Sequence, residues 1–247
     1  MLDPIAFEVG PLAIRWYGIL MSTALALGTY LAYREADRQN IDPEQILNLV
    51  IIAAPLAFIG ARAYYVIFQW PYYSQHPSEI PAIWHGGLAI HGALIMGVLA
   101  GYLFVRRQGL NFWQMADIVA PSIILGQAIG RWGNFFNQEA YGYPTDLPWA
   151  MYIDGAYRHP TFLYESLWDL GVFLVLLWYR RRKKEVHGEV FLLYAALYSL
   201  GRFVVEGLRT DSLMLGNLRA AQVISVVIIA ATMGMFYYRR KKLLQDK

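Results

Sequence analysis

The sequence contains no cysteine and few charged residues. Because none of the 247 residues is cysteine, disulfides, zinc–thiolate sites and cysteine nucleophiles are excluded. A reaction at a thiol would have to use a thiol brought by the substrate. Charged residues make up 16% of the chain, below the roughly 25% typical of a soluble domain. This deficit indicates a protein that resides in lipid.

Motifs of several common enzyme classes are also missing. The chain has no H-E-x-x-H zinc motif, no G-x-S-x-G nucleophile motif and no Walker sequence. Metal and serine-hydrolase chemistry therefore have no support, and we expect neither a metal nor another cofactor. The net charge of +3 does not indicate a nucleic-acid partner, because the basic residues gather in loops and tails, as membrane topology requires.

Apolar residues dominate what is present. Hydrophobic residues make up 57% of the chain, and seven apolar stretches approach the roughly 20 residues that a membrane-crossing helix needs. The sequence predicts an all-α, polytopic membrane protein of about seven transmembrane helices. The stretches are Ile14–Tyr33, Ile46–Phe68, Gly87–Val105, Phe112–Phe135, Thr161–Tyr179, Glu189–Val205 and Leu218–Tyr238.

Neither a repeat of fixed period nor a disordered linker is visible in the sequence. We therefore expect a single transmembrane domain over residues 1–247, with a small extracytoplasmic loop region at residues 136–160. The first apolar stretch lacks a small-residue cleavage site, so we expect it to be a membrane helix rather than a removed signal peptide.

The basic residues predict the orientation. Of the 21 lysines and arginines, 14 fall on one side of a seven-span chain, whereas the loop at residues 69–85 has none. The positive-inside rule places the basic side in the cytoplasm, with the N-terminus outside and the C-terminus inside. The 14 residues are Arg34, Arg38, Arg106, Arg107, Arg180, Arg181, Arg182, Lys183, Lys184, Arg239, Arg240, Lys241, Lys242 and Lys247.

The remaining basic residues are all arginine, and several fall within or beside apolar stretches. A charge near the bilayer centre costs about 2.5–3.5 kcal/mol on insertion scales, so it needs a partner, an anionic ligand or water. Arginine stays protonated, and its planar fork fits a carboxylate or a phosphate. The seven residues are Arg15, Arg62, Arg131, Arg158, Arg202, Arg209 and Arg219.

The densest polar segment lies at the predicted outer end of the fourth stretch, around Arg131. In a helix, Arg131 and Asn134 would share one face, and Gly133 would let a lipid headgroup or another helix approach closely. Asn137 and Glu139 follow directly. The alternative is an ordinary helix end whose arginine extends outward to the interface.

A second cluster consists of Arg202, Glu206 and Arg209. Their i, i+4 and i+7 spacing can place all three on one helical face. The alternative for Glu206 is a salt bridge that only orients Arg202. For Arg202 the functional interpretation is favoured, since one carboxylate does not fully use two nearby guanidiniums.

Isolated polar residues complete the set of candidates. His91 is of a residue type that can accept a proton near neutral pH, and the alternative is an interfacial histidine. Tyr17 is expected near the outer interface, where the alternative is the aromatic belt. Arg62 and Asp117, each inside an apolar stretch, are candidates to pair with each other. Glu165 is expected to interact favourably with a helix dipole.

Together these segments resemble the bacterial prolipoprotein diacylglyceryl transferase family. The match is most specific over residues 130–139 and covers nearly the whole chain in the family's order. Two positions depart from the usual pattern: Ala93 stands where a glycine is usual, and Phe162 where glutamine is frequent. The other matching segments are Trp16-Tyr17-Gly18, Ile90-His91-Gly92, Ala116-Asp117-Ile118-Val119-Ala120-Pro121, His159-Pro160 through Tyr164-Glu165, and Gly201-Arg202 through Glu206 and Arg209.

The resemblance implies an enzyme of the bacterial inner membrane that acts on a lipid and a protein. It would move the diacylglyceryl group of phosphatidylglycerol onto the lipobox cysteine of a preprolipoprotein, forming a thioether and releasing glycerol phosphate. Arg131 and Arg202 are implied to be essential and close to the phosphate. The other residues implied to matter are Tyr17, His91, Asn134, Glu139, Glu206 and Arg209.

The residue types make physical sense of that reaction. Two arginines in a water-poor site can stabilise charge that grows on a leaving phosphate. The headgroup glycerol could be hydrogen-bonded by Tyr17, Asn134, Asn137 or Glu139. The thiol, with an ordinary pKa of about 8.5, needs activation either by His91 as base or by the arginine field, and we favour the arginines as primary.

Two other function classes stay open at this point. Intramembrane arginines also mark transport pathways, but an anion transporter or lipid flippase would predict inverted repeats, and none is visible. A non-catalytic scaffold that binds phosphatidylglycerol is the third class.

Overall fold

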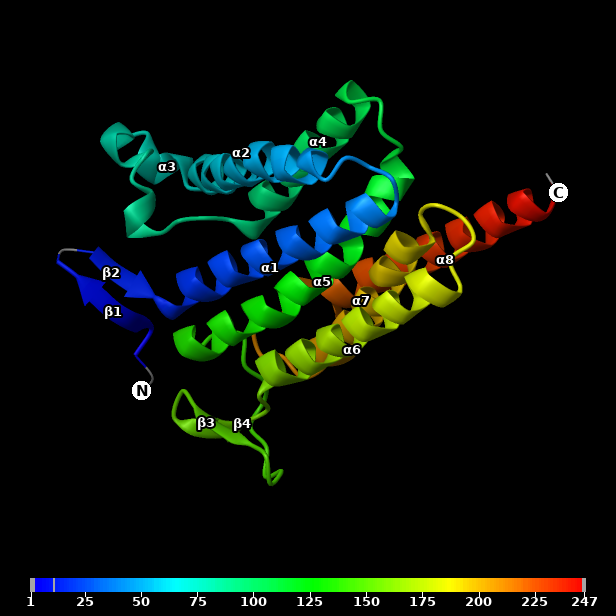
Figure 1. The fold of residues 1–247 in the computed structure, drawn as a ribbon. Helices are drawn as coiled ribbons and strands as arrows, with labels where there is room; N and C mark the ends of the chain where they lie inside the picture. The colour runs from blue at the N-terminus through cyan, green and yellow to red at the C-terminus, as the bar shows by residue number, and fades with distance from the viewer. Residues whose placement is uncertain (1–2, 11, 246–247) are drawn as a thin grey trace. The chain divides into compact units, whose positions relative to one another are not determined.

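The computed structural model describes residues 3–10 and 12–245, which are mostly helical. A long helix forms at each of the seven apolar stretches, so the predicted positions of the helices are confirmed (Figure 1). A short helix, α3 (Trp70–Tyr73), and two 3₁₀ turns, η1 (Pro77–Glu79) and η2 (Ile83–His85), separate α2 from α4. The long helices are α1 (Trp16–Arg38), α2 (Glu44–Phe68), α4 (Ile90–Arg107), α5 (Phe112–Asn137), α6 (Thr161–Arg182), α7 (Glu189–Glu206) and α8 (Ala220–Gln245).

Five of these helices, α2, α4, α5, α6 and α8, are long and apolar enough to cross a membrane. In contrast, α7 carries three charged residues, Glu189, Arg202 and Glu206, within its 18 residues. Large apolar side chains are widely exposed along the helices, and only 11% of the apolar window of α8 is buried. Continuous exposed apolar surface is unfavourable in water and suits lipid. The fold is that of a multi-pass membrane protein.

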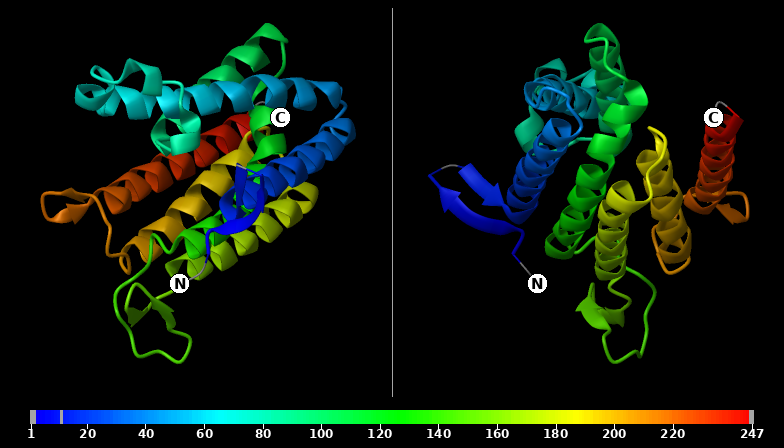
Figure 2. Two further views of the ribbon diagram at one scale, coloured as in Figure 1. Left: turned by 90° about the vertical axis from the view of Figure 1, so that its left-hand side faces the viewer. Right: turned by 45° about the vertical axis from the view of Figure 1, so that its right-hand side comes forward.

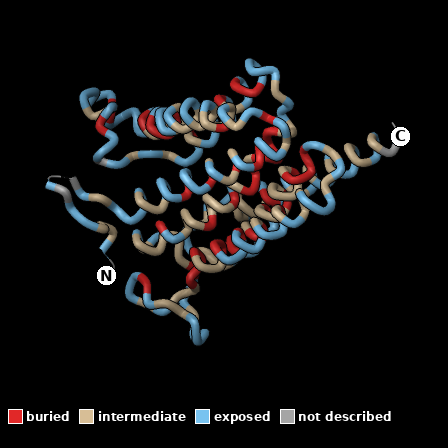
Figure 3. The backbone as a smooth tube through the Cα atoms, viewed as in Figure 1, coloured by how far each residue is buried: buried red, intermediate tan, exposed pale blue. Residues whose placement is uncertain are grey.

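The chain divides into two compact units. The first comprises residues 1–31 and 116–247, and the second comprises residues 32–115. In the first unit, α5, α6, α7 and α8 run side by side (Figure 2). Their buried residues lie where the helices face one another, and exposed residues cover the other faces (Figure 3).

The core of the first unit is apolar. Ala120 and Ile124 of α5 pack with Val172 and Leu176 of α6 and with Val190 of α7, and each is at most 4% exposed. At the N-terminal end of α7, Asp117 of α5 accepts hydrogen bonds from the backbone N–H groups of Gly188 (2.7 Å) and Phe191 (2.9 Å). Asp117 thereby caps a neighbouring helix, because the first N–H groups of a helix lack partners within it.

The second unit is built on α2 and α4, which pack closely through glycines. A Cβ on Gly92 of α4 would overlap the backbone of Gly60 of α2, so the contact depends on the missing side chain. Arg62 of α2 is 7% exposed and donates hydrogen bonds to backbone carbonyls of the loop that leads into α4. The acceptors are the carbonyls of Glu79, Ile80, Ala82, Gly86 and Gly87, at 2.7–3.4 Å.

Arg62 and Asp117, the candidates to pair with each other, both bind other groups. Each residue is engaged within its own unit, Arg62 by backbone carbonyls and Asp117 by backbone N–H groups and by Lys184 at 3.1 Å. A guanidinium has five donors that fit carbonyl oxygens as well as carboxylates. Buried charge therefore predicted the need for a partner but not which partner.

Three short antiparallel hairpins add to the helices: β1 (Ile5–Val9) with β2 (Leu12–Arg15), β3 (Met151–Ile153) with β4 (Ala156–Arg158), and β5 (Met214–Leu215) with β6 (Leu218–Arg219). In the β3–β4 hairpin, Ile153 pairs with Ala156 across Asp154 and Gly155, both of which have positive φ. An Asp-Gly pair with positive φ is typical of a two-residue hairpin turn. This hairpin lies within the segment expected to form the extracytoplasmic loop region.

Candidate active site

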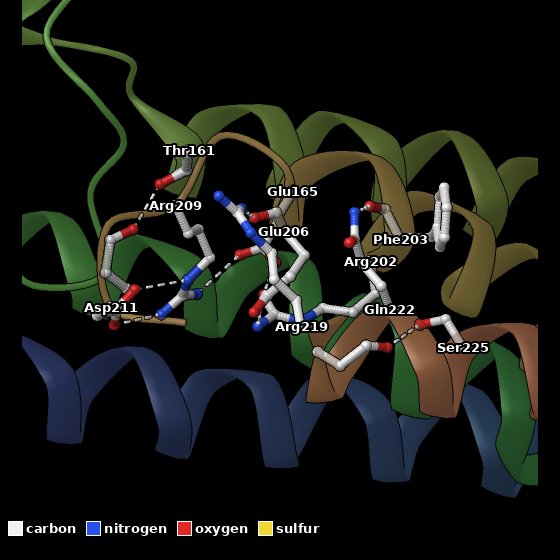
Figure 4. Close-up of polar contacts among 12 residues, drawn as sticks. Thr161, Glu165, Arg202, Phe203, Glu206, Arg209, Asp211, Arg219, Gln222 and Ser225 are labelled. Atoms are coloured by element: carbon white, nitrogen blue, oxygen red, sulfur yellow. Dashed lines mark hydrogen bonds and ion pairs between the residues drawn. The ribbon is translucent and has the colours of Figure 1, made fainter. Parts of the chain in front are cut away.

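Charged residues from α5, α6 and α7 meet around one buried carboxylate in the first unit. Glu165 of α6, whose side chain is 5% exposed, pairs with Arg131 of α5 at 3.1 Å through one oxygen. Its other oxygen accepts a hydrogen bond from Arg202 of α7 at 2.7 Å. Two guanidiniums from different helices therefore converge on one anion. We call Arg131, Glu165, Arg202, Glu206 and Arg209 the arginine cluster (Figure 4 labels all but Arg131).

Within α7, Arg202 and Glu206 form the ion pair that their i, i+4 spacing predicts. Glu206 is 1% exposed, so its carboxylate lies almost wholly out of solvent. Its backbone carbonyl accepts a hydrogen bond from Arg219. The pairing orients Arg202 toward Glu165, because each terminal nitrogen of its guanidinium contacts a different carboxylate.

Arg209 does not share a helical face with the other two, contrary to the spacing argument. The helix α7 ends at Glu206, and Arg209 lies in the segment that follows it. Arg209 still reaches the cluster, at 3.9 Å from Glu165, and donates two hydrogen bonds to Asp211 at 2.9 and 2.6 Å. Burial raises the pKa of Asp211, but the hydrogen bonds from Arg209 outweigh it and hold the pKa below its ordinary value.

Backbone contacts fix the segment that carries Arg209 against the loop after α5. Gly142 pairs with Arg209 as an isolated β-bridge, and the N–H of Tyr143 donates to the carbonyl of Leu208 at 2.9 Å. A Cβ on Gly142 would crowd His159 and the same carbonyl. The close approach of the two chains therefore requires glycine at this position.

A second polar group forms at the C-terminal end of α5. The side-chain amides of Asn134 and Asn137 both donate to Glu139, at 3.0 and 3.2 Å. The ring of Tyr17 lies against Gly133, where a Cβ would overlap it, and the charges of Glu139 and Arg131 act on its hydroxyl. The structure thus brings together the four residues expected to bind the headgroup.

His91 belongs to the second unit. It is exposed at the start of α4, and its ring stacks on Tyr64 of α2 with centroids 5.8 Å apart. Its role as a base stays a prediction.

Sequence reasoning missed Glu165, the residue that joins the three arginines of the cluster. Its place in the first turns of α6 suggested only an interaction with the helix dipole. Its partners Arg131 and Arg202 are 34 and 37 positions away in the chain, so only helix packing reveals the contact. The available signal in the sequence was that Glu165 is a carboxylate at the edge of an apolar stretch, in a segment that resembles the transferase family.

This arrangement suits an anionic substrate group. Arginine binds carboxylate and phosphate through parallel N–H donors, and charged donors act strongly where water is excluded. The side chains of Arg131 and Arg202 are 19% and 20% exposed, so a ligand can still reach them. Among the described residues, no group of three or more histidines and carboxylates is placed to hold a metal ion.

Fold and site together define a class: a multi-pass helical membrane protein in which arginines and carboxylates of three helices meet beside its apolar segments. A family model described as prolipoprotein diacylglyceryl transferase matches residues 4–238. The chain is 55% identical to the phosphatidylglycerol–prolipoprotein diacylglyceryl transferase of Geobacillus kaustophilus, over 98% of this chain and 94% of that protein. The proteins of the same name from Bacillus licheniformis and Thermosynechococcus vestitus are each 53% identical, over 98% and 96% of this chain and 94% and 93% of theirs.

The chain therefore belongs to the prolipoprotein diacylglyceryl transferase family and is a transferase.

Proposed function

We propose that this protein transfers the diacylglyceryl group of phosphatidylglycerol to the lipobox cysteine of a preprolipoprotein, as the names of its relatives describe for them. The thiol sulfur forms a bond to the glyceryl carbon, and the bond from that carbon to the phosphate oxygen breaks. Glycerol phosphate leaves, and the product is a thioether. The observation that carries this proposal is the convergence of Arg131 and Arg202 on one buried anion.

The arginines supply the main catalytic effect. Negative charge grows on the phosphate as the carbon–oxygen bond breaks, and donors already aimed at it stabilise the transition state more than the ground state. Each guanidinium has five N–H donors, of which the contacts to Glu165, Glu206 and Tyr198 use only part. Phosphate oxygens can thus bind beside Glu165 while that carboxylate keeps Arg131 and Arg202 in place.

Headgroup recognition falls to the second polar group. Asn134, Asn137, Glu139 and Tyr17 offer donors and acceptors that match the two hydroxyls of the glycerol headgroup. A headgroup without hydroxyls would leave these groups unpaired, which disfavours its binding. Arg209 extends the positive potential of the site, and His91 remains a candidate base for the thiol.

The topology follows from the charges at the helix ends. We propose that α1 and α7 also cross the membrane, which gives seven spans. The helices α1, α4, α6 and α8 each end in arginines or lysines, and these ends face the cytoplasm. The N-terminus, the arginine cluster and residues 136–160 then belong to the outer side, where prolipoproteins emerge.

A transfer assay on purified protein tests the activity. Labelled phosphatidylglycerol and a lipobox peptide are supplied, and label on the peptide cysteine is measured for wild type, R131A, R202A and the control R182A. The control removes an exposed arginine at the end of α6. Each site variant should lower the rate about 10²–10³-fold, and the control should not.

Other results would contradict the proposal. Lipid binding by the wild type without any transfer would support the scaffold function, and movement of lipid between leaflets without transfer would support a flippase. Equal activity in R131A and R182A would remove the arginine cluster from the mechanism.

A further inference from the structure

Asp169 is a buried carboxylate that the proposed mechanism does not use. It lies on α6 with 2% of its surface exposed. Its Oδ2 atom is buried and has no hydrogen-bond partner among the described residues. A buried polar atom without a partner costs about 1–3 kcal/mol, and more when it is charged. Such an atom needs a reason, and a hydrogen-bond donor on the substrate is one.

The position of Asp169 relates it directly to the arginine cluster. It follows Glu165 by four residues, so the two side chains share one face of α6, about 6 Å apart along the helix. Arg131 and Glu165 are the charged groups whose fields act on it. Asp169 therefore lies one helical turn deeper into the bundle than the contact between Glu165 and the arginines.

Two neighbouring helices also carry polar groups one or two turns deeper than the arginines. Gln127 precedes Arg131 by four residues on α5, and its side chain accepts a hydrogen bond from Tyr194 of α7 at 3.2 Å. The charge of Asp169 acts on Tyr194. Gln127, Asp169 and Tyr194 thus form a second polar layer, and the apolar core around Ile124, Val172 and Leu176 lies beyond it.

This order matches the order of groups in a membrane phospholipid. Passing inward, a phospholipid presents its phosphate, then its glyceryl carbons, then its acyl chains. The protein presents the arginine cluster, then the second polar layer, then apolar residues. If the phosphate binds at Arg131 and Arg202, the glyceryl carbon whose bond to oxygen breaks lies between the arginine cluster and the second polar layer.

The attacking sulfur has a defined place in this arrangement. In a direct displacement it approaches the carbon from the side opposite the leaving oxygen, about 3–3.5 Å away before reaction. Together with the bonds that link the phosphorus to this carbon, the distance from the phosphorus to the sulfur is roughly 6 Å, which is close to the rise of one helical turn. The sulfur is then at the depth of Asp169.

The chemistry of the two substrates limits which substrate group can donate a hydrogen bond to Asp169. A carboxylate only accepts hydrogen bonds. The ester groups of the lipid have no donor, and the headgroup hydroxyls lie on the far side of the phosphate. The thiol S–H of the cysteine is a weak donor and is the reacting group expected at this depth.

We propose that Asp169 contacts the substrate cysteine and accepts a hydrogen bond from its thiol, which holds the sulfur behind the glyceryl carbon. This assignment rests on the proposed transferase function. In the reaction the sulfur–carbon bond forms and the carbon–oxygen bond breaks. The proton lost by the thiol ends on the departing glycerol phosphate, which leaves as its hydrogen phosphate monoanion.

The test compares D169L, which removes the acceptor, with D169N, which keeps one acceptor oxygen. L170A is the matched control, since Leu170 is the next residue on α6 and is 41% exposed. For each variant, kcat/KM is measured for a lipobox peptide at saturating phosphatidylglycerol. Binding of fluorescent phosphatidylglycerol is measured separately and reports an intact arginine cluster.

We expect D169L to lower kcat/KM for the peptide about 10–100-fold, the loss typical of one hydrogen bond to a charged group, with lipid binding unchanged. The kcat/KM of D169N should stay within about tenfold of the wild-type value, and that of L170A should equal the wild-type value. Normal peptide kinetics in D169L would overturn the assignment, as would equal loss of lipid binding in D169L and D169N. Absence of transfer by the wild type would instead overturn the proposed function itself.

Discussion

Replacing Glu165 with glutamine keeps the size of the side chain and removes the charge that joins the arginine cluster. In the wild type, Arg131, Arg202 and Arg209 contact the carboxylates of Glu165, Glu206 and Asp211. The variant removes one of these negative charges from a buried site, and the new amide N–H₂ group is a donor that faces other donors.

The expected loss of stability follows from the contacts. Glu165 makes two close charged contacts, at 3.1 and 2.7 Å, and one at 3.9 Å. The charge-assisted hydrogen bond from Arg202 contributes about 1.5–3 kcal/mol, and the ion pair with Arg131 adds to it. Removing one partner of a buried ion pair typically costs about 3–5 kcal/mol. For a chain of this size that corresponds to a Tm lower by roughly 6–20 °C.

Thermal unfolding in detergent, with and without phosphatidylglycerol, measures this effect. The lipid phosphate supplies the missing negative charge, so E165Q should gain more stability from the lipid than the wild type does. Transfer activity should fall because Arg131 and Arg202 lose their common anchor. E185Q is the control, since Glu185 is 54% exposed at 3.7 Å from its arginine partner and such pairs contribute little. A variant E165Q with wild-type Tm and rate would refute the central role of Glu165.

Two further predictions concern residues around the site. Asp117→Ala removes the acceptor of the Gly188 and Phe191 N–H groups. Each buried N–H group left unpaired costs about 1–3 kcal/mol, so the variant should have a lower Tm than the wild type. An unchanged Tm would contradict the capping role of Asp117. Asp211→Asn tests pH dependence: because the folded-state pKa of Asp211 is depressed, its contribution is present above the unfolded-state pKa and disappears as the pH falls through the folded-state value. The difference in Tm between wild type and D211N should therefore shrink from pH 7 to pH 3, and a constant difference would argue against the Arg209–Asp211 pairing.

The helices were predictable because lipid imposes a simple rule on the sequence. A segment that crosses the membrane must be apolar over its length. A helix forms at each of the seven stretches, and five of these helices are long and apolar enough to cross. The ends were less predictable. The helix α1 continues to Arg38 and α8 to Gln245, beyond the predicted apolar stretches. Charged residues at the helix ends favour a helix as much as apolar residues do, but a search for apolar stretches leaves them out.

The site was predictable only in part. Arg131, Arg202 and Glu206 stood out because charge in an apolar segment needs a partner, and the contact between Arg202 and Glu206 is local in the chain. Glu165 and Asp169 gave little signal, since their meaning depends on how α6 packs on α5 and α7. The face assigned to Arg209 was wrong because helical spacing holds only while the helix lasts, and α7 ends three residues earlier.

Buried charge also determines how α5, α6, α7 and α8 align. Beside the capping contact of Asp117 on α7, Glu189 of α7 is fully buried and bonds Arg240 of α8 at 2.5 Å and Tyr179 of α6 at 3.1 Å. The arginine cluster joins α5, α6 and α7 at their opposite ends. Between the two ends the contacts are mostly apolar, and dispersion contacts tolerate sliding because they are not directional, but a few hydrogen bonds such as the one from Tyr194 to Gln127 lie there as well. A shift of one helix by a single turn would leave charges unpaired at both ends at once, at about 3–5 kcal/mol for each broken buried pair. The polar contacts at the two ends therefore set the register that brings Arg131 and Arg202 onto one anion, and the apolar core supplies the packing that holds it.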